Sequence, residues 1–201
     1  MKIQIDSDIT KAKTISSKFY HSKKVYQKLK KLFDRSWQFI RDTNLLKGNN
    51  VHPGILLEGM VDEPYILTKE NKNIRCLSNV CTHRGNIVCS DSCKTKILVC
   101  GYHGRQFEIN GKMKFMPEFD DVADFPNKED NLPEIEMESW KNLIFIINDK
   151  KCDLSELIGP MVERLDWLPV NEFKFKPELS RTYKVNANWA LYCDNYLEGF
   201  H

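Results

Sequence analysis

The sequence has no hydrophobic run that approaches the roughly 20 apolar residues of a membrane-spanning helix. It also lacks a secretory signal, because its opening, MKIQIDSDITKAKT, has neither an apolar centre nor a cleavage-site pattern. We therefore expect a cytoplasmic protein with no membrane partner. In that reducing compartment, the 7 cysteines are expected to be free thiols or metal ligands rather than disulfides.

An excess of charge of one sign is absent as well, and the formal net charge of +2 gives no reason to expect a nucleic-acid partner. Internal repeats and low-complexity tracts are also missing. The rest of the composition is ordinary for a soluble globular protein, with 41% hydrophobic and 11% aromatic residues. A length of 201 residues can bury one full core, or one domain plus part of another.

Residues 22–42 have the pattern of an amphipathic helix. Their apolar side chains recur at helical spacing, with lysines on the other side: Val25, Leu29, Leu32, Phe33, Trp37 and Ile40. The lysines could dock an acidic redox partner, but the solvated face of a helix explains them more simply.

Short β-type runs follow a boundary near residue 50, where LLKGNNVHPG is rich in Gly, Asn and Pro and places His52 in a turn. The runs are separated by turn residues: ILLEGM, PYILTK, IRCLSNV, KILVCGY, RQFEI and LIFII. Asn110-Gly111 is a strong hairpin signal. The pattern predicts a small antiparallel β domain.

The later part of the chain is less regular. PEFDDVADFPNKEDNLPEIEME is interpreted as a solvated acidic connection, with a contact to a neighbouring subunit as the alternative. A helix is expected over residues 153–168, and SRTYKVNANWALYCDNYLEGFH has the pattern of a strand entering a helix. We therefore expect a helical segment over residues 1–48, the β domain over 49–152, and the start of another domain over 153–201.

Two islands of sequence place a cysteine beside a histidine: Cys81-Thr-His83 and Cys100-Gly-Tyr-His103. Each pair is expected at the tip of a β hairpin, where nearby glycines allow tight turns. Two thiolates and two imidazoles can close one metal site. Zinc would accept this set of ligands. The alternative is a [2Fe-2S] cluster in which two cysteines hold one iron and two histidines hold the other.

These motifs carry a family resemblance. CTHRG followed by CGYHG resembles the cluster motif of Rieske non-haem iron oxygenases of the ring-hydroxylating type, and the similarity runs from about Phe19 to His201. The resemblance implies a mainly β fold: a Rieske [2Fe-2S] antiparallel β domain with two cluster-binding hairpin loops, preceded by an N-terminal helix and followed by the start of an α+β catalytic domain. It implies these cluster ligands: Cys81, His83, Cys100 and His103.

Three positions distinguish this motif within the Rieske families. Respiratory Rieske proteins join the two loops by a disulfide, and the corresponding residues here are Asn86 and Tyr102. Arg105 stands where those proteins have a serine that donates to a cluster sulfide, and where oxygenases more often have tryptophan. With fewer donors, we expect a reduction potential toward the low end of the roughly −150 to +300 mV Rieske range.

The chain end carries a second group of candidates. Asp194, Glu198 and His201 are spaced to share one helical face, with Asn195 beside them. Taken alone, such residues are more often surface groups than an iron site. The resemblance instead implies that all four belong to a catalytic site. His201 would be the first ligand of a mononuclear Fe(II), Glu198 would link the cluster of one subunit to the iron of the next, and Asn195 would lie near the open side of the iron.

The resemblance implies an oxidoreductase, a Rieske mono- or dioxygenase that hydroxylates or demethylates a small-molecule substrate with O2. A ferredoxin or flavin reductase would donate electrons, and the full-length enzyme would be a homotrimer. CDNYLEGFH is most similar to the choline monooxygenase and betaine or carnitine oxygenase branch. Because one ligand of the mononuclear iron is present, we expect an N-terminal portion that is inactive alone. A stand-alone Rieske ferredoxin-like electron carrier is the alternative.

The remaining cysteines need another explanation. Cys89 and Cys93 could form a C-x-x-x-C metal site, but free thiols are the simpler interpretation because the cluster ligands are complete without them. Cys76, Cys152 and Cys193 lie among apolar neighbours and are expected to be small buried hydrophobic residues.

Overall fold

The computed structural model describes residues 5–197, which divide into two compact units. One unit consists of residues 33–176 and the other of the described residues on either side, 5–32 and 177–197. Among residues 5–197, none of the helices is both long and apolar enough to cross a membrane. The architecture is mainly antiparallel β, as the sequence predicts.

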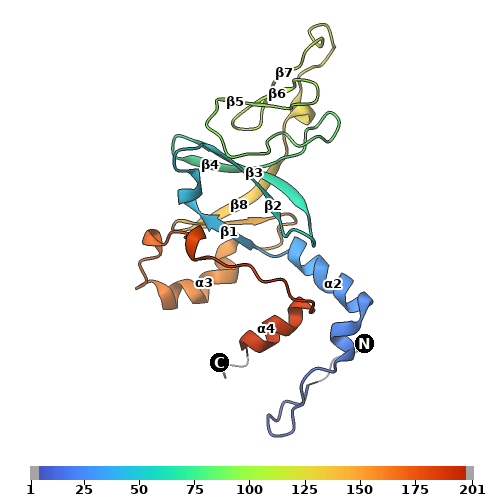
Figure 1. The fold of residues 1–201 in the computed structure, drawn as a ribbon, viewed down its shortest axis with the longest axis vertical. Coiled ribbons are helices and arrows are strands. Elements are labelled where there is room, and N and C mark those ends of the chain that lie inside the picture. The colour runs from blue at the N-terminus through green and yellow to red at the C-terminus, as the bar shows by residue number, and fades with distance from the viewer. Residues whose placement is uncertain (1–4, 198–201) are drawn as a thin grey trace. The chain divides into compact units, whose positions relative to one another are not determined.

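The larger unit contains two antiparallel sheets (Figure 1). The six-stranded sheet has the order β1-β9-β8-β4-β3-β2, and the three-stranded sheet has the order β5-β6-β7. The strands are β1 Gln38–Asp42, β2 Val51–Leu56, β3 Glu63–Glu70, β4 Asn73–Ser78, β5 Ile97–Val99, β6 Gln106–Glu108, β7 Met113–Phe115, β8 Glu134–Trp140 and β9 Leu143–Ile147.

Helices are few. In Figure 1, α3 lies toward one end of the larger unit and the three-stranded sheet toward the other, next to β3 and β4. The helices are α1 Lys18–His21, α2 Lys23–Asp34, α3 Leu154–Leu165 and α4 Trp189–Leu197, with 3-10 turns η1 Thr43–Leu46, η2 Lys128–Asp130, η3 Val170–Glu172 and η4 Pro177–Leu179. The helix predicted over residues 153–168 is confirmed as α3.

The main hydrophobic core includes the two motif cysteines. Cys81 and Cys100 pack with buried side chains from both sheets: Val51, Ile66, Leu77, Val88, Leu98, Phe107, Ile109, Met113, Met116 and Leu132. This packing fixes the first residue of each of the two loops that begin at Cys81 and Cys100. The hydrophobic core therefore positions the cysteine and histidine motifs.

The predicted hairpin at Asn110-Gly111 joins β6 and β7. Lys112 N–H donates to Asn110 Oδ1 at 2.9 Å, and Gly111 adopts φ +87°, which favours glycine. A Cβ at Gly111 would lie 3.0 Å from a Leu77 methyl and 3.3 Å from the Leu132 carbonyl oxygen, so a side chain there would also be tightly packed. Both features are local, which explains why the sequence predicts them.

The helix predicted over residues 22–42 is wrong in its second half. α2 ends at Asp34, and β1 pairs with β9 from Gln38 onward. Trp37 is buried in a cluster with Ile147 and Leu154, and its indole Nε1 donates to the carbonyl of Cys152 at 3.0 Å. This packing with distant residues overrides the local helical periodicity.

The turn expected around His52 is also wrong. His52 lies within β2 and faces Leu67 of β3, while residues 57–62, which include the end of the predicted ILLEGM strand, form the turn. Val51 is fully buried and bridges Cys93. The strand therefore begins four residues earlier than expected because its pairing partners, rather than its local composition, set the register.

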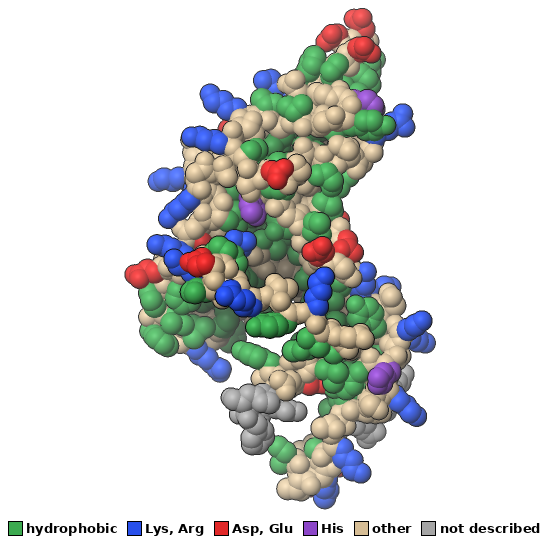
Figure 2. Space-filling view, in the orientation of Figure 1, with side chains coloured by type: hydrophobic (Ala, Val, Ile, Leu, Met, Phe, Trp, Pro, Cys, Tyr) green, Lys and Arg blue, Asp and Glu red, His purple; other side chains and the backbone are tan. Residues whose placement is uncertain are grey.

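The acidic segment is a loop only in its first part. Figure 2 shows acidic side chains gathered over the tip of the loop that follows β7, where Glu118, Asp120 and Asp121 are exposed. The predicted loop ends too late, because Glu134–Trp140 form β8, which pairs with β4 and β9. The chain end differs too: α4 forms, but residues 180–188 do not form the expected strand.

Gly54 lies so close to the Tyr65 ring that adding a side chain at this position should change the stability of the protein. It pairs with Tyr65 across β2 and β3, and a Cβ at Gly54 would lie 2.4 Å from the Tyr65 ring. Gly54→Ala should therefore lower the free energy of unfolding by about 1–3 kcal/mol, because Tyr65 is buried and must shift.

Urea denaturation measures this loss. Gly159→Ala in α3 is the matched control, since nothing lies within 4 Å of its Cβ position. The control should raise stability by up to about 1 kcal/mol through helix propensity. Equal behaviour of the two variants would show that the approach of Tyr65 to Gly54 is not tight.

Candidate metal centre

The first motif loop begins after β4 and is closed by two backbone hydrogen bonds. Cys81 N–H donates to the Asn86 carbonyl at 2.8 Å, and Gly85 N–H donates back to the Cys81 carbonyl at 3.0 Å. Gly85 has φ +70°, a conformation that favours glycine. Val80 and Ile87 form an antiparallel bridge across the loop, so it closes a short hairpin as predicted, although β4 itself pairs with β3 and β8.

The second motif loop repeats the same pattern between β5 and β6, which do form a hairpin. Cys100 N–H donates to the Arg105 carbonyl at 2.8 Å, and Gly104 N–H donates to the Cys100 carbonyl at 3.1 Å. Gly104 has φ +71°, nearly the value of its counterpart in the first loop. Two loops of the same backbone geometry therefore present the two halves of the motif.

The four motif side chains meet as two like pairs. Cys81 and Cys100 pack in the same core cluster, where each thiol affects the pKa of the other, and these residues are only 3% and 2% exposed. The imidazoles of His83 and His103 have ring centroids 4.8 Å apart, with His103 exposed and His83 partly so. The sulfur pair thus lies in the core and the imidazole pair at the surface.

Hydrogen bonds around the sulfurs favour thiolate. Burial acts to raise the pKa of Cys100, but N–H groups of Tyr102 and His103, the Cys81 thiol and the Asn86 amide together lower it. The Asn86 Nδ2 donor lies 3.7 Å from Cys100 Sγ. Burial raises the pKa of Cys81, against an N–H bond from His83. One thiol of the pair is therefore poised to ionise first.

The histidine at the first loop is held in its neutral form. Desolvation, followed by the nearby positive charges of His103, Arg105 and Arg84, lowers the pKa of His83. A neutral imidazole and a thiolate are the forms that bind metals.

The arrangement distinguishes between the two metal centres left open by the sequence. Among residues 5–197, no three His, Cys, Asp or Glu side chains converge on a position that could hold a single metal ion. Zinc requires ligands that converge on one ion. A [2Fe-2S] cluster with mixed ligation instead needs a cysteine pair and a histidine pair that are displaced from each other. The residues present fit the cluster.

Arg105 has a partner that sequence reasoning missed. Its guanidinium forms an ion pair with Asp130, and the two side chains are only 4% and 18% exposed. Arg105 Nη1 also donates to Thr82 Oγ1 at 3.1 Å, and that hydroxyl donates to the Asp130 carbonyl at 2.7 Å. A buried arginine requires a carboxylate, but the sequence could not indicate which acidic residue supplies it.

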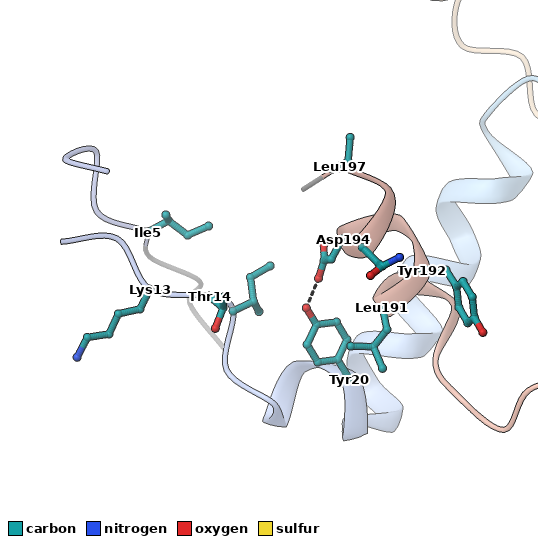
Figure 3. A pocket seen from close by; sticks show the side chains of 10 residues that line it. Ile5, Lys13, Thr14, Tyr20, Leu191, Tyr192, Asp194 and Leu197 are labelled. Carbon is teal, nitrogen blue, oxygen red and sulfur yellow. Dashed lines mark hydrogen bonds between the residues drawn. The ribbon is translucent and has the colours of Figure 1, made fainter. Parts of the chain in front are cut away.

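The other candidate residues belong to the smaller unit. Figure 3 shows Tyr20 and Asp194 facing each other, and the Tyr20 hydroxyl donates to the Asp194 carboxylate. Asp194 and Asn195 are on α4 and line an open cavity of 820 Å³. Asn188 Nδ2 donates to the Tyr20 carbonyl at 2.9 Å, so α1 and the start of α4 are tied together. Glu198 and His201 lie outside the described residues.

The remaining cysteines differ in exposure. Cys76 is buried as predicted, and desolvation raises its pKa strongly. Cys152 is half-buried and Cys193 is exposed, so the prediction of a buried Cys193 is wrong. Cys193 lies on the solvent side of α4, a face that the apolar neighbours in the sequence did not reveal. Cys89 and Cys93 are half-buried free thiols.

Comparisons with known proteins agree with this geometry. Residues 36–126 match the family model described as the Rieske [2Fe-2S] domain. The oxygenase subunit of carnitine monooxygenase from Escherichia coli strain K12 is 27% identical over 194 residues, which cover 94% of this chain and 50% of that protein. Chloroplastic choline monooxygenase from Beta vulgaris is 25% identical over 180 residues, which cover 85% of this chain and 39% of that protein.

Solved structures share the fold. The quaternary ammonium Rieske monooxygenase CntA in complex with an inhibitor gives a TM-score of 0.77 at 24% identity, covering 91% of this chain and 52% of that chain. Another structure of a quaternary ammonium Rieske monooxygenase was reported with insights into inter-subunit electron transfer. It gives a TM-score of 0.65 at 23% identity, and the match covers 74% of this chain and 41% of that chain. This chain spans about half, or less, of the length of these proteins.

Proposed function

We propose that the chain is the N-terminal part of a Rieske oxygenase alpha subunit, because residues 36–126 match the Rieske [2Fe-2S] domain model and most of the chain is similar to carnitine and choline monooxygenases. Its ligands would be these four residues: Cys81, His83, Cys100 and His103. The observation that carries this proposal is the pairing of thiol with thiol and imidazole with imidazole on two loops of the same geometry. When bound, the cluster would accept and deliver one electron at a time.

The chain's own residues prepare the site. The core packing of Cys81 and Cys100 keeps water from the sulfurs, and the surrounding N–H groups stabilise their negative charge. His83 and His103 carry the other half of the site to the surface, where an electron partner can reach it. Tyr102 stacks on His103 with ring centroids 3.9 Å apart, which restricts the orientation of that imidazole.

The extent of the similarity supports an oxygenase rather than a stand-alone electron carrier. A ferredoxin-like protein needs the cluster domain alone, but the carnitine relative matches 94% of the chain and so extends beyond residues 36–126. The segment after residue 176 includes α4, which carries Asp194 and Asn195. We therefore propose that the catalytic domain starts within residues 153–201, with boundaries near residues 48 and 152 that both lie inside the compact unit of residues 33–176.

In the full-length protein, His201 would be the first ligand of a mononuclear Fe(II) completed by another histidine and a carboxylate. Glu198 would accept a hydrogen bond from His103 of a neighbouring chain, and Asn195 would lie near the iron's open side. The Tyr20–Asp194 hydrogen bond supports this role for α4, because it fixes the orientation of the helix. A second histidine encoded shortly after His201 would support this assignment, and its absence would favour the electron carrier.

The names of the related enzymes indicate a class of substrate. Carnitine and choline monooxygenases are named for quaternary ammonium compounds, so the full-length protein would hydroxylate or demethylate a small molecule of that class. Electrons would come from a ferredoxin or flavin reductase in the cytoplasm. A homotrimer would bring the cluster of one subunit to the iron of the next, in line with the inter-subunit transfer reported for a structural neighbour.

Iron analysis and electron paramagnetic resonance test the cluster. Reconstituted protein should contain about two irons and two sulfides per chain and, when reduced, give the low-average-g signal of mixed cysteine and histidine ligation. Cys81→Ala should reduce the iron content to less than about one-tenth, because a single cysteine cannot hold the buried iron. Cys193→Ala is the matched control, since that thiol is exposed on α4. A colourless protein with one tightly bound zinc would contradict the proposal.

A further inference from the structure

We propose that Cys89 and Cys93, which the candidate metal centre does not use, are a peroxide-sensitive pair that closes a reversible disulfide within the loop between β4 and β5. The proposal is independent of the proposed function, because it concerns two thiols outside the four motif ligands. It rests on the way in which the backbone holds both cysteines and on the cavity that both side chains share.

The backbone of Cys89 is fixed by one buried amide side chain. Cys89 N–H donates to Asn79 Oδ1 at 2.9 Å, and Asn79 Nδ2 donates to the Cys89 carbonyl at 2.8 Å. Asn79 is only 3% exposed and directly follows β4. These reciprocal bonds give Cys89 a defined position in the loop between β4 and β5.

The backbone of Cys93 is fixed by a strand. Cys93 N–H donates to the Val51 carbonyl, and Val51 N–H donates to the Cys93 carbonyl, both at 3.1 Å. Val51 is fully buried at the start of β2. Cys89 and Cys93 are therefore held at the two ends of a short segment, Ser90-Asp91-Ser92, whose residues are exposed.

The two side chains converge from these anchors. Both pack against the main core, both are half-buried, and both line one open cavity beside β5. The Cys93 thiol lies near enough to raise the pKa of the Cys89 thiol, which donates to the Asp91 carbonyl at 3.1 Å within the same short segment. The shared cavity holds both thiols and admits a small oxidant. A thiol beside a resolving thiol can undergo reversible oxidation to a disulfide.

The chemistry balances with a hydroperoxide as the oxidant. The thiolate of one cysteine attacks the peroxide oxygen, the O–O bond breaks, and a sulfenic acid and one water are formed when the oxidant is hydrogen peroxide. The second thiol attacks the sulfenic sulfur, the S–S bond forms, and a second water leaves. Two thiols are thus oxidised by two electrons, and a dithiol reductant reverses the change.

Two features set the expected rate of oxidation and the expected change in stability. Desolvation, together with the neighbouring Cys93, raises the pKa of Cys89, so we expect oxidation over minutes to hours rather than seconds. The ring that closes is short, so the disulfide should change the global stability little. The disulfide itself is therefore the quantity to measure.

The sequence offers a clean assay. Trypsin cleavage after Arg84 and Lys94 releases one peptide, residues 85–94, which contains Cys89 and Cys93 and no other cysteine. Cluster-loaded protein would be exposed to a small excess of hydrogen peroxide, blocked with N-ethylmaleimide, digested and analysed by mass spectrometry. We expect at least ten times more disulfide than doubly blocked peptide, and complete recovery of the thiols with dithiothreitol.

Variants test whether the fold promotes disulfide formation between Cys89 and Cys93 or whether the two thiols oxidise independently of their positions. Asn79→Ala removes the anchor of Cys89 and should slow disulfide formation several-fold, while Ser90→Ala, at an exposed position, should not. The exposed thiol of Cys193 should give no internal disulfide under the same treatment. The proposal is overturned if folded protein retains two blocked thiols in peptide 85–94, or if Cys89 and Cys93 oxidise faster after unfolding than in the folded chain.

Discussion

Replacing Asp130 with leucine should lower the free energy of unfolding by about 3–5 kcal/mol, because it leaves a buried guanidinium without its counter-charge. Arg105 and Asp130 form an ion pair whose side chains are 4% and 18% exposed, so little water can take the place of the carboxylate. Within the described residues, Arg105 Nε already has no hydrogen-bond partner, so without Asp130 the guanidinium would keep a hydrogen bond to Thr82 but no counter-charge.

The loss should extend to both motif loops. Arg105 directly follows the second loop, and it donates to Thr82, which lies between Cys81 and His83 in the first. The second carboxylate oxygen of Asp130 accepts from Asn127 N–H at 2.9 Å and caps η2. Removing Asp130 therefore loosens three segments together, and hydrogen exchange in both loops should increase.

Urea denaturation measures the effect. Asp149→Leu is the matched control, because Asp149 pairs with Arg35 at the surface, where water screens the charges. It should change stability little. The double variant Arg105→Met/Asp130→Leu should recover most of the loss, since it removes both buried charges. A loss for Asp130→Leu no larger than that for Asp149→Leu would show that the ion pair is not buried in solution.

The partner of Arg105 illustrates why part of the site could not be predicted. The motif itself is local: residue types, spacing and glycines are all present within a few positions, and the structure brings the four side chains together. Asp130 lies 25 positions after Arg105 in an acidic segment with many carboxylates. Nothing local selects one of them, because the choice depends on how the chain returns over the second loop.

The same distinction explains the fold. The Asn110-Gly111 hairpin is encoded by its own turn residues and is predicted correctly. The strand β1 is not predicted correctly, because its residues also recur at helical spacing. Gln38 pairs with Ile146, more than 100 positions away, and this distant pairing decides that the segment forms a strand. β8 was hidden for a similar reason: its acidic residues alternate with Ile135 and Met137, which pack against other strands.

Replacing both His83 and His103 with cysteine should lower the reduction potential of the cluster by at least about 250 mV, from the Rieske range toward the roughly −400 mV of all-cysteine plant-type clusters. The two imidazoles are adjacent, and desolvation, followed by nearby positive charges, lowers the pKa of His83, so neutral ligands are replaced with anionic ones. Added negative charge stabilises the oxidised cluster more than the reduced one, and the potential falls.

A redox titration followed by electron paramagnetic resonance measures this change, and the average g value should rise with thiolate ligation. His21→Cys provides the control, because it adds a cysteine on α1, in the separate smaller unit that holds none of the four motif ligands. Iron content must be measured in parallel, since a lower potential is meaningful only where about two irons per chain remain. An unchanged potential at full iron content would mean that the two histidines lie near the cluster without binding it, and the assignment of a Rieske cluster with mixed ligation would fail.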